Sequence, residues 1–186
     1  MSAPAASAPA APPAPPAAPT LRSVRVVKIV VNSGVGESGE PRTKAEKVLQ
    51  MVTRQKPVAT RSKSTNRDFG IRAGQEIGVK VTLRGAAARD FLERALEARD
   101  RQLDPDSIDR RGSFSFGISD YTDFAGMKYD PNIGVRGMDI AVELGRAGWR
   151  VRDRKVRSHP LGPHVRVSRD EAREFLRTAF RVTFLE

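Results

Sequence analysis

RVVKIVVNSGVGESG, residues 25–39, is the stretch that decides how this chain folds. An apolar run from Val24 to Val31, broken only by Arg25 and Lys28, predicts a strand with buried side chains. After Asn32 the chain enters a turn, and helical spacing follows a few residues later. The turn contains the glycines Gly34, Gly36 and Gly39. Strand, Gly-x-Gly-x-x-Gly and helix in this order form the dinucleotide-binding fingerprint, so the interpretation of this stretch bears on function as well.

Three features argue against a nucleotide-binding enzyme built on this glycine turn. The fingerprint needs an acidic residue about 20 positions further on to hold the ribose, and residues 50–67 contain no Asp or Glu. Residues 40–42 separate the last glycine from a helix expected to begin near Thr43, whereas the fingerprint glycines open the helix. The next segment is rich in Arg and Lys and does not alternate strand with helix. Two interpretations remain, a plain glycine turn with positive φ and a contact of Asn32 and bare backbone with nucleic acid.

Composition favours a polyanionic partner. The 186 residues carry a net charge of +11 with a pI near 10.8. Of the 33 basic residues 25 are Arg, which binds phosphate in a fork geometry. The absence of Cys excludes disulfides and thiolate metal sites and is compatible with the reducing cytoplasm. The apolar segments of the sequence are too short to span a bilayer, so we expect no membrane partner.

The first 20 residues differ in composition from the rest of the chain. They consist of nine Ala, seven Pro, Met1, Ser2, Ser7 and Thr20. Proline donates no backbone hydrogen bond and alanine has little surface to bury, so we expect a disordered tail. A secretory signal would need a basic start and an unbroken apolar centre, and both are missing. Residues 21–186 are therefore expected to form one domain.

The alternation of apolar and polar residues predicts the fold class. Ile77, Val79, Val81 and Leu83 face one side of a predicted strand, and Gly78, Lys80, Thr82 and Arg84 face the other. Residues 113–119 and 138–144 alternate in the same way. Helical spacing follows Thr43 and Gly85, and a capping box at residues 168–171 starts a last helix. Together these elements predict an α+β fold, with an antiparallel sheet covered by helices on one face and open for RNA on the other.

Two segments gather positive charge. The first, RSKSTNRDFGIRAG (61–74), is expected to be a long hairpin connection, and loops of this length are usually functional. Its cations are Arg61, Lys63, Arg67 and Arg72. The second lies within residues 145–169 around the single Trp149, and its cations include Arg150, Arg152, Arg154, Lys155 and Arg157. For both segments an ordinary solvated surface is the alternative. His159 and His164 alone are thin evidence for zinc, and we expect no metal or other cofactor.

Three blocks of sequence resemble one protein family. They are VVNSGVGES (30–38), TRQKPVATRSKSTNRDFGIRAGQEIGVKVTLRG (53–85) and GSFSFGISDYTDFAGMKYDPNIGVRGMDIAVELGRAG (112–148). These blocks resemble the L-five family of large-subunit ribosomal proteins, and the third is most similar to its archaeal and eukaryotic branch. The resemblance extends from about Ser23 to the end of the chain. It implies a ribosomal protein that is not an enzyme, binds 5S ribosomal RNA and links it to the large ribosomal RNA in the central protuberance, beside neighbouring ribosomal proteins.

The resemblance also implies roles for individual residues. Contacts with 5S RNA fall on Asn32, Gln55 and Thr82, and the loop 61–74 reaches the P-site transfer RNA. The sequence itself adds Lys80 and Arg84, which flank Thr82 on its strand face and can neutralise phosphates. We expect the segment 150–157 to face ribosomal RNA. Few exposed aromatic residues are apparent, which favours recognition of RNA shape and backbone over base stacking. Two alternatives remain: a generic basic protein that coats any RNA, and a nucleotide-binding enzyme that uses the turn at Gly34, Gly36 and Gly39.

Overall fold

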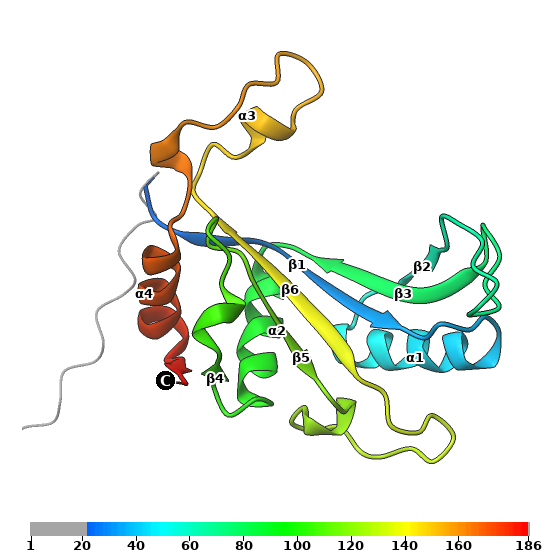
Figure 1. Cartoon of the computed structure of the whole chain (residues 1–186). Helices are drawn as coiled ribbons and strands as arrows, with labels where there is room; N and C mark the ends of the chain where they lie inside the picture. Colours follow the sequence, from blue (N-terminus) through cyan, green and yellow to red (C-terminus); the bar gives the residue numbers. More distant parts are fainter. Residues whose placement is uncertain (1–21, 186) are drawn as a thin grey trace, which may run out of the picture.

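The computed structural model describes residues 22–185, apart from the side chain of His164, so the predicted tail at residues 1–20 lies outside the described residues. Five strands form one sheet: β1 (Arg25–Gly34), β2 (Val58–Arg61), β3 (Glu76–Leu83), β5 (Phe114–Ile118) and β6 (Met138–Gly145). Their order across the sheet is β2-β3-β1-β6-β5, and every neighbouring pair is antiparallel. β1 is therefore the central strand (Figure 1).

The helices α1 (Glu40–Thr53) and α2 (Ala86–Glu97) lie on one side of the sheet, and α4 (Arg169–Phe180) lies beside α2 near the start of β1 (Figure 1). This arrangement confirms the predicted α+β fold with helices on one face. Smaller elements complete the chain: β4 (Gln102–Leu103), which pairs in parallel with β7 (Thr183–Phe184), the short helix α3 (Arg150–Asp153), and the 3-10 turns η1 (Pro105–Ser107), η2 (Tyr121–Asp123) and η3 (Pro163–Val165).

The core lies between the sheet and the helices because the strands alternate. Alternate residues of β1, β3 and β6, among them Ile29, Val81 and Ile140, are buried against the helices. The helices contribute apolar residues at helical spacing, which include Ala45, Val48, Leu49 and Val52 of α1 and Ala88, Phe91, Leu92, Ala95 and Leu96 of α2. One face of the sheet is thus committed to the core, and the other is left exposed.

A bulge near the start of β1 keeps this alternation in register. The pairing of β1 with β6 shifts between Val26 and Lys28, so Val27 is the extra residue. Val26 then lies opposite Leu144 of the core, while Lys28 lies opposite Glu143 on the exposed side. Close packing at the bulge requires glycine at position 145, since a Cβ there would lie 2.9 Å from Cγ2 of Val27.

The start of α1 corrects one prediction made from the sequence. The helix begins at Glu40 with Gly39 as its N-cap, not near Thr43, and Pro41 lies in its first turn. The glycine turn therefore does open the helix, and the predicted separation of the two by residues 40–42 was wrong. Topology gives a stronger reason against dinucleotide binding, because β1 is antiparallel to both neighbours while the fingerprint belongs to parallel βαβ units. In addition, Glu40 adds a negative charge to the first turn of α1, which disfavours a pyrophosphate at this helix N-terminus.

The predicted capping box at the start of α4 is present. The backbone N–H of Glu171 donates to Oγ of Ser168 (3.3 Å), and that of Ser168 donates to Oε2 of Glu171 (3.0 Å). Arg146, just after β6, donates to Oε1 of Glu171 (2.7 Å). The Ser168 N–H, and then Arg146, hold the pKa of the Glu171 carboxyl below its usual value. This carboxylate therefore connects the end of β6 to the last helix.

We expect Glu171→Gln to destabilise the protein at neutral pH by about 0.5 kcal/mol, as for a partly exposed ion pair. Because the folded-state pKa of Glu171 is lowered, its contribution is complete above the ordinary value of 4.5 and is lost as the pH falls through the folded value. Thermal unfolding of both proteins should therefore differ near pH 7 and converge in acid. A difference that persists in acid would show that the Glu171 charge is not its source.

Candidate nucleic-acid interface

The exposed side of the sheet, here called the open face, carries a continuous set of side chains from four strands. They are Lys80 and Thr82 of β3, Lys28, Val30 and Asn32 of β1, Asp139, Ala141 and Glu143 of β6, and Ser115 and Gly117 of β5. Asn32 lies directly between Lys80 and Asp139, and Val30 lies between Thr82 and Ala141. Strand pairing therefore fixes these groups at spacings of about 5 Å.

Charge is divided across the open face. The cations expected on the strand at residues 77–84 are present, since β3 presents Lys80 and leads into the exposed Arg84. β6 instead presents the acidic residues Asp139 and Glu143. Glu143 is neutralised, since Lys28 Nζ lies 2.8 Å from its Oε2 and Arg152 Nη2 lies 3.6 Å from its Oε1. The face thus offers cations on one side and hydrogen-bond acceptors on the other.

The open face is hollowed over β1, β6 and β5. A cavity of about 370 Å³ lies there, with Val30 and Ala141 in its lining and Ser107 and Asp109 among the residues beyond the sheet that border it. Small side chains produce the hollow, since Ala141 lies between Val30 and Ser115 in the pairing. A convex ridge, such as a sugar–phosphate backbone, has room to approach the sheet at this point.

The five residues predicted to contact 5S RNA do not all share one location. Asn32, Lys80 and Thr82 lie together on the open face. Arg84 directly follows β3 and is exposed. Gln55 lies in the connection from α1 to β2, exposed at the edge of the sheet, three residues before Val58, which pairs with Lys80. The structure thus groups three of the five and places the other two at the margins of the same sheet.

The loop 61–74 is the predicted hairpin connection, between β2 and β3. All four predicted cations are exposed, and Arg61 pairs with Glu76 (3.4 Å). Within residues 22–185 the other three, Lys63, Arg67 and Arg72, have no carboxylate within 4.0 Å of their charged nitrogens. Few aromatic residues are exposed, as expected, but one of them lies in this loop: Phe69 is 75% exposed, and Tyr129 outside the loop is 57% exposed. A sequence alone does not tell which aromatic residues of polar loops stay outside the core.

The segment around α3 is the second basic region. Arg152 contacts two other residues of this segment: its guanidinium lies 4.1 Å from the centre of the Trp149 ring, and its Nε lies 2.9 Å from Oδ1 of Asp153. Arg154 donates from Nε to the backbone oxygen of Arg157 (2.8 Å). The exposed cations left without a carboxylate partner among the described residues are Arg150, Arg154, Lys155 and Arg157. Of the five predicted cations in this segment, four are thus available to an anionic partner.

The two basic regions lie at opposite ends of β1 (Figure 1). Arg25 pairs with Gly145, which leads into the α3 segment, while Gly34 pairs with Gly78 near the loop 61–74. β1 has 10 residues, which corresponds to roughly 30 Å of strand. The open face lies between the two regions, so one molecule presents three separate surfaces to large partners.

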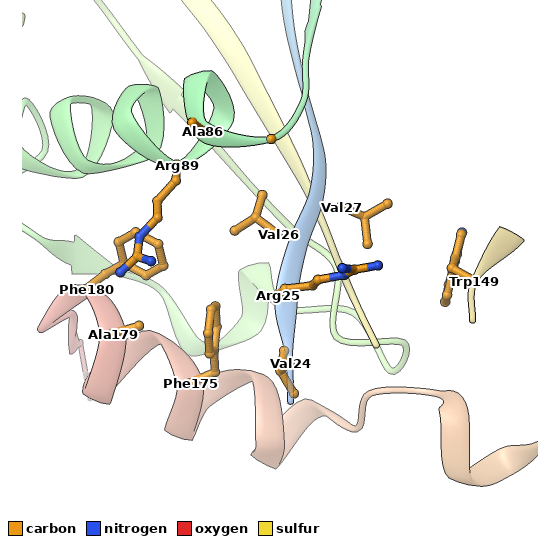
Figure 2. A pocket seen from close by; sticks show the side chains of 11 residues that line it. Val24, Arg25, Val26, Val27, Ala86, Arg89, Trp149, Phe175, Ala179 and Phe180 are labelled. Carbon is orange, nitrogen blue, oxygen red and sulfur yellow. The ribbon is translucent and has the colours of Figure 1, made fainter. Parts of the chain in front are cut away.

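Another cavity lies on a different side of the molecule. About 610 Å³ in volume, it is bordered by the start of β1 and by α2 and α4 (Figure 2). Its lining is apolar, with Phe175 and Phe180 from α4, apart from Arg25 and Arg89. Two guanidinium groups among apolar side chains do not form a general acid–base pair, so this cavity gives no support to an enzymatic function.

Residues 22–185 contain no cluster of three or more His, Cys, Asp or Glu side chains that could hold a metal ion. The helices in this part of the chain are also too short or too polar to cross a bilayer.

Comparison with known proteins identifies the family. Residues 20–72 match the family model described as Ribosomal protein L5, and residues 76–158 match the model of the C-terminus of the same ribosomal family. The large ribosomal subunit protein uL5 of Thermoplasma volcanium is 49% identical over 156 residues, which cover 83% of this chain and 92% of that protein. The chain belongs to the uL5 family. The uL5 proteins of Sulfurisphaera tokodaii and Methanoculleus marisnigri are each 47% identical, over 85% and 83% of this chain and 90% and 92% of their own lengths.

Membership of the uL5 family confirms the resemblance to the L-five ribosomal proteins, including its archaeal character. The chain is accordingly a structural constituent of the large ribosomal subunit and not an enzyme. Its partners therefore include ribosomal RNA and other ribosomal proteins. The uL5 family membership does not by itself assign the open face, the loop 61–74 or the α3 segment to a particular RNA.

Proposed function

We propose that the open face binds 5S ribosomal RNA, and that this protein thereby links 5S RNA to the large ribosomal RNA in the central protuberance. The observation that carries the proposal is the row in which Lys80, Asn32 and Asp139 lie side by side on three paired strands. A rigid sheet holds these groups without further ordering on binding, which lowers the entropic cost of association.

Each side of the open face suits a different part of an RNA strand. Lys80 and Arg84 can neutralise phosphates, which gives affinity without sequence preference. Asn32 and Thr82 are short hydrogen-bonding groups suited to sugar and phosphate oxygens. Asp139 repels phosphate but accepts hydrogen bonds from ribose 2′-hydroxyls and base amino groups. This combination favours an RNA backbone that enters with phosphates over β3 and sugars over β6.

The loop 61–74 and the α3 segment lie apart from the open face, so we assign them to other RNA partners. The loop 61–74 contacts the P-site transfer RNA, and the α3 segment with Arg150, Arg154, Lys155 and Arg157 faces the large ribosomal RNA. Gln55 contributes to the 5S RNA contact from the edge of the sheet, and Arg152 supports the α3 segment through Trp149. Residues 21–186 act as one domain, and the Ala/Pro-rich residues 1–20 take no part in RNA binding.

Thr82→Val tests the assignment of the open face. The substitution keeps shape and strand preference but removes a hydroxyl, which in a desolvated RNA contact costs about 1–3 kcal/mol. We expect the affinity for 5S RNA to fall by roughly fivefold to a hundredfold, measured by titration of labelled RNA. Thr183→Val is the matched control, because Thr183 is an exposed strand residue of the separate β4–β7 pair. Equal affinities of parent and Thr82→Val would make Thr82 an ordinary surface residue.

A further inference from the structure

Phe69 is the most exposed large apolar residue among residues 22–185. The residue is 75% exposed, more than Val156 at 73% or Val135 at 64%. Burying a phenylalanine ring is normally worth about 1.5–3 kcal/mol, and single exposed apolar residues are common. Exposure alone therefore assigns no role, and the local structure around the ring has to decide.

The tip of the loop 61–74 is an ordered turn that presents this ring. Asn66 and Ile71 exchange two backbone hydrogen bonds (2.8 and 2.9 Å), which closes the tip. Within it the N–H of Asp68 donates to Oδ1 of Asn66 (3.0 Å), and the N–H of Gly70 donates to the oxygen of Arg67 (3.1 Å). Gly70 has φ +64°, a conformation that favours glycine. Phe69 is held at the end of this turn, facing solvent.

The base of the loop is fixed to the rest of the domain. Ser62 and Gln75 are joined by a backbone hydrogen bond of 2.8 Å, and Thr65 Oγ1 accepts from the N–H of Ala73 (3.0 Å). The Gln75 side chain donates to Oγ of Ser38 (2.9 Å) in the glycine turn after β1. The exposed ring is thus carried by a tied hairpin, and little conformational entropy would be lost when it meets a partner.

The charges around the ring point to a partner that is both flat and anionic. Lys63, Arg67 and Arg72 share this hairpin, all exposed, and Asp68 is its single acid. An apolar protein pocket would bury these cations without compensation. RNA offers a π-face for the ring and phosphates for the cations at the same time.

We propose that Phe69 stacks on an unpaired or helix-terminal base of RNA while the cations of its hairpin bind the flanking phosphates. The proposal rests on the function proposed above, in which this loop contacts transfer RNA, and it adds the mode of contact: stacking on a base, in addition to backbone attraction. Stacking is tolerant of sequence because every base has a π-face, so the contact suits a surface that meets many different transfer RNAs.

The test uses large subunits reconstituted with variant protein, assembled into ribosomes, and measures the affinity of deacylated transfer RNA for the P site. We expect Phe69→Ala to weaken binding about tenfold with no change in salt dependence, because no charge is removed. Phe69→Leu should weaken binding nearly as much, since it keeps the apolar volume and loses the π-face. Phe69→Tyr should bind within about twofold of the parent.

The outcomes separate the two proposals. The paired variant Arg67→Ser with Arg72→Ser should weaken binding and lower the salt slope. If this pair weakens binding while Phe69→Ala does not, the loop contacts transfer RNA and stacking is wrong. A Phe69→Leu variant that binds as tightly as the parent would replace stacking by simple apolar contact and would also overturn the inference. If neither the charge pair nor Phe69→Ala has an effect, the transfer RNA role of the loop fails as well.

Discussion

Ala141→Glu should abolish most of the affinity for 5S RNA, with a loss of about a hundredfold or more. Ala141 is exposed in the middle of the open face, opposite Val30 and Ser115, and it borders the hollow of about 370 Å³. A glutamate there fills the hollow that the sugars of the RNA backbone enter, and its negative charge repels the phosphates that lie over the neighbouring strands. Juxtaposed like charges at an interface cost several kcal/mol, and a hundredfold corresponds to about 2.7 kcal/mol.

The control for this variant is Ala87→Glu, which makes the same change on the opposite side of the molecule. Ala87 is exposed in the first turn of α2, where a carboxylate is compatible with the helix dipole. Both variants should unfold at temperatures close to the parent, and Ala87→Glu should bind 5S RNA within about twofold of it. If the two variants lost affinity equally, the effect would be one of net charge, and the open face would have no special role.

Replacing the four loop cations should separate the two RNA contacts. With Arg61, Lys63, Arg67 and Arg72 changed to Ser, we expect 5S RNA binding to stay close to the parent in both affinity and salt slope. Ribosomes that carry the same variant should hold P-site transfer RNA roughly tenfold less tightly, because phosphate contacts are lost. The salt slope of this binding should also fall, by about 0.7–0.9 for each phosphate that is no longer neutralised. The one ion pair removed, between Arg61 and Glu76 at 3.4 Å, lies at the surface and is worth little to stability.

The matched variant for this comparison carries two changes on the sheet, Lys80→Ser and Arg84→Ser. It should lower the salt slope of 5S RNA binding by up to about 1.4–1.8, as expected for two phosphate contacts. A loss of 5S RNA affinity by more than about tenfold in the loop variant, about 1.4 kcal/mol, would assign the loop to the 5S site. The proposed division between sheet and loop would then be wrong.

The local sequence pattern predicted most of the sheet, because alternation along a strand determines on which face of the sheet each side chain lies. Val79, Val81 and Leu83 had to lie together, and with them Lys80 and Thr82 had to share the opposite face. The capping box at Ser168 was likewise readable, because its two reciprocal hydrogen bonds depend only on residues three apart. The helix start at Glu40 was missed because proline early in a first turn begins a helix as well as it ends one.

Features that depend on long-range pairing could not be predicted. Asp139 and Glu143 were visible in the sequence, but only the pairing of β6 with β1 places them beside Asn32 and Lys28. The same holds for the contact of Arg152 with Glu143, which depends on how the α3 segment lies against β6. Strand order is set by the burial of the whole domain, so no local pattern encodes which strand becomes the neighbour of another.

The central claim is that the open face recognises 5S RNA and does not merely attract polyanions. The direct measurement is a titration of the parent protein with 5S RNA and with an unrelated RNA of equal length, each at two salt concentrations. The account predicts tighter binding of 5S RNA at both concentrations, with a preference that persists when salt weakens the phosphate contacts common to both RNAs. Equal affinities for the two RNAs, falling together with salt, would contradict it and leave a basic protein that binds any RNA.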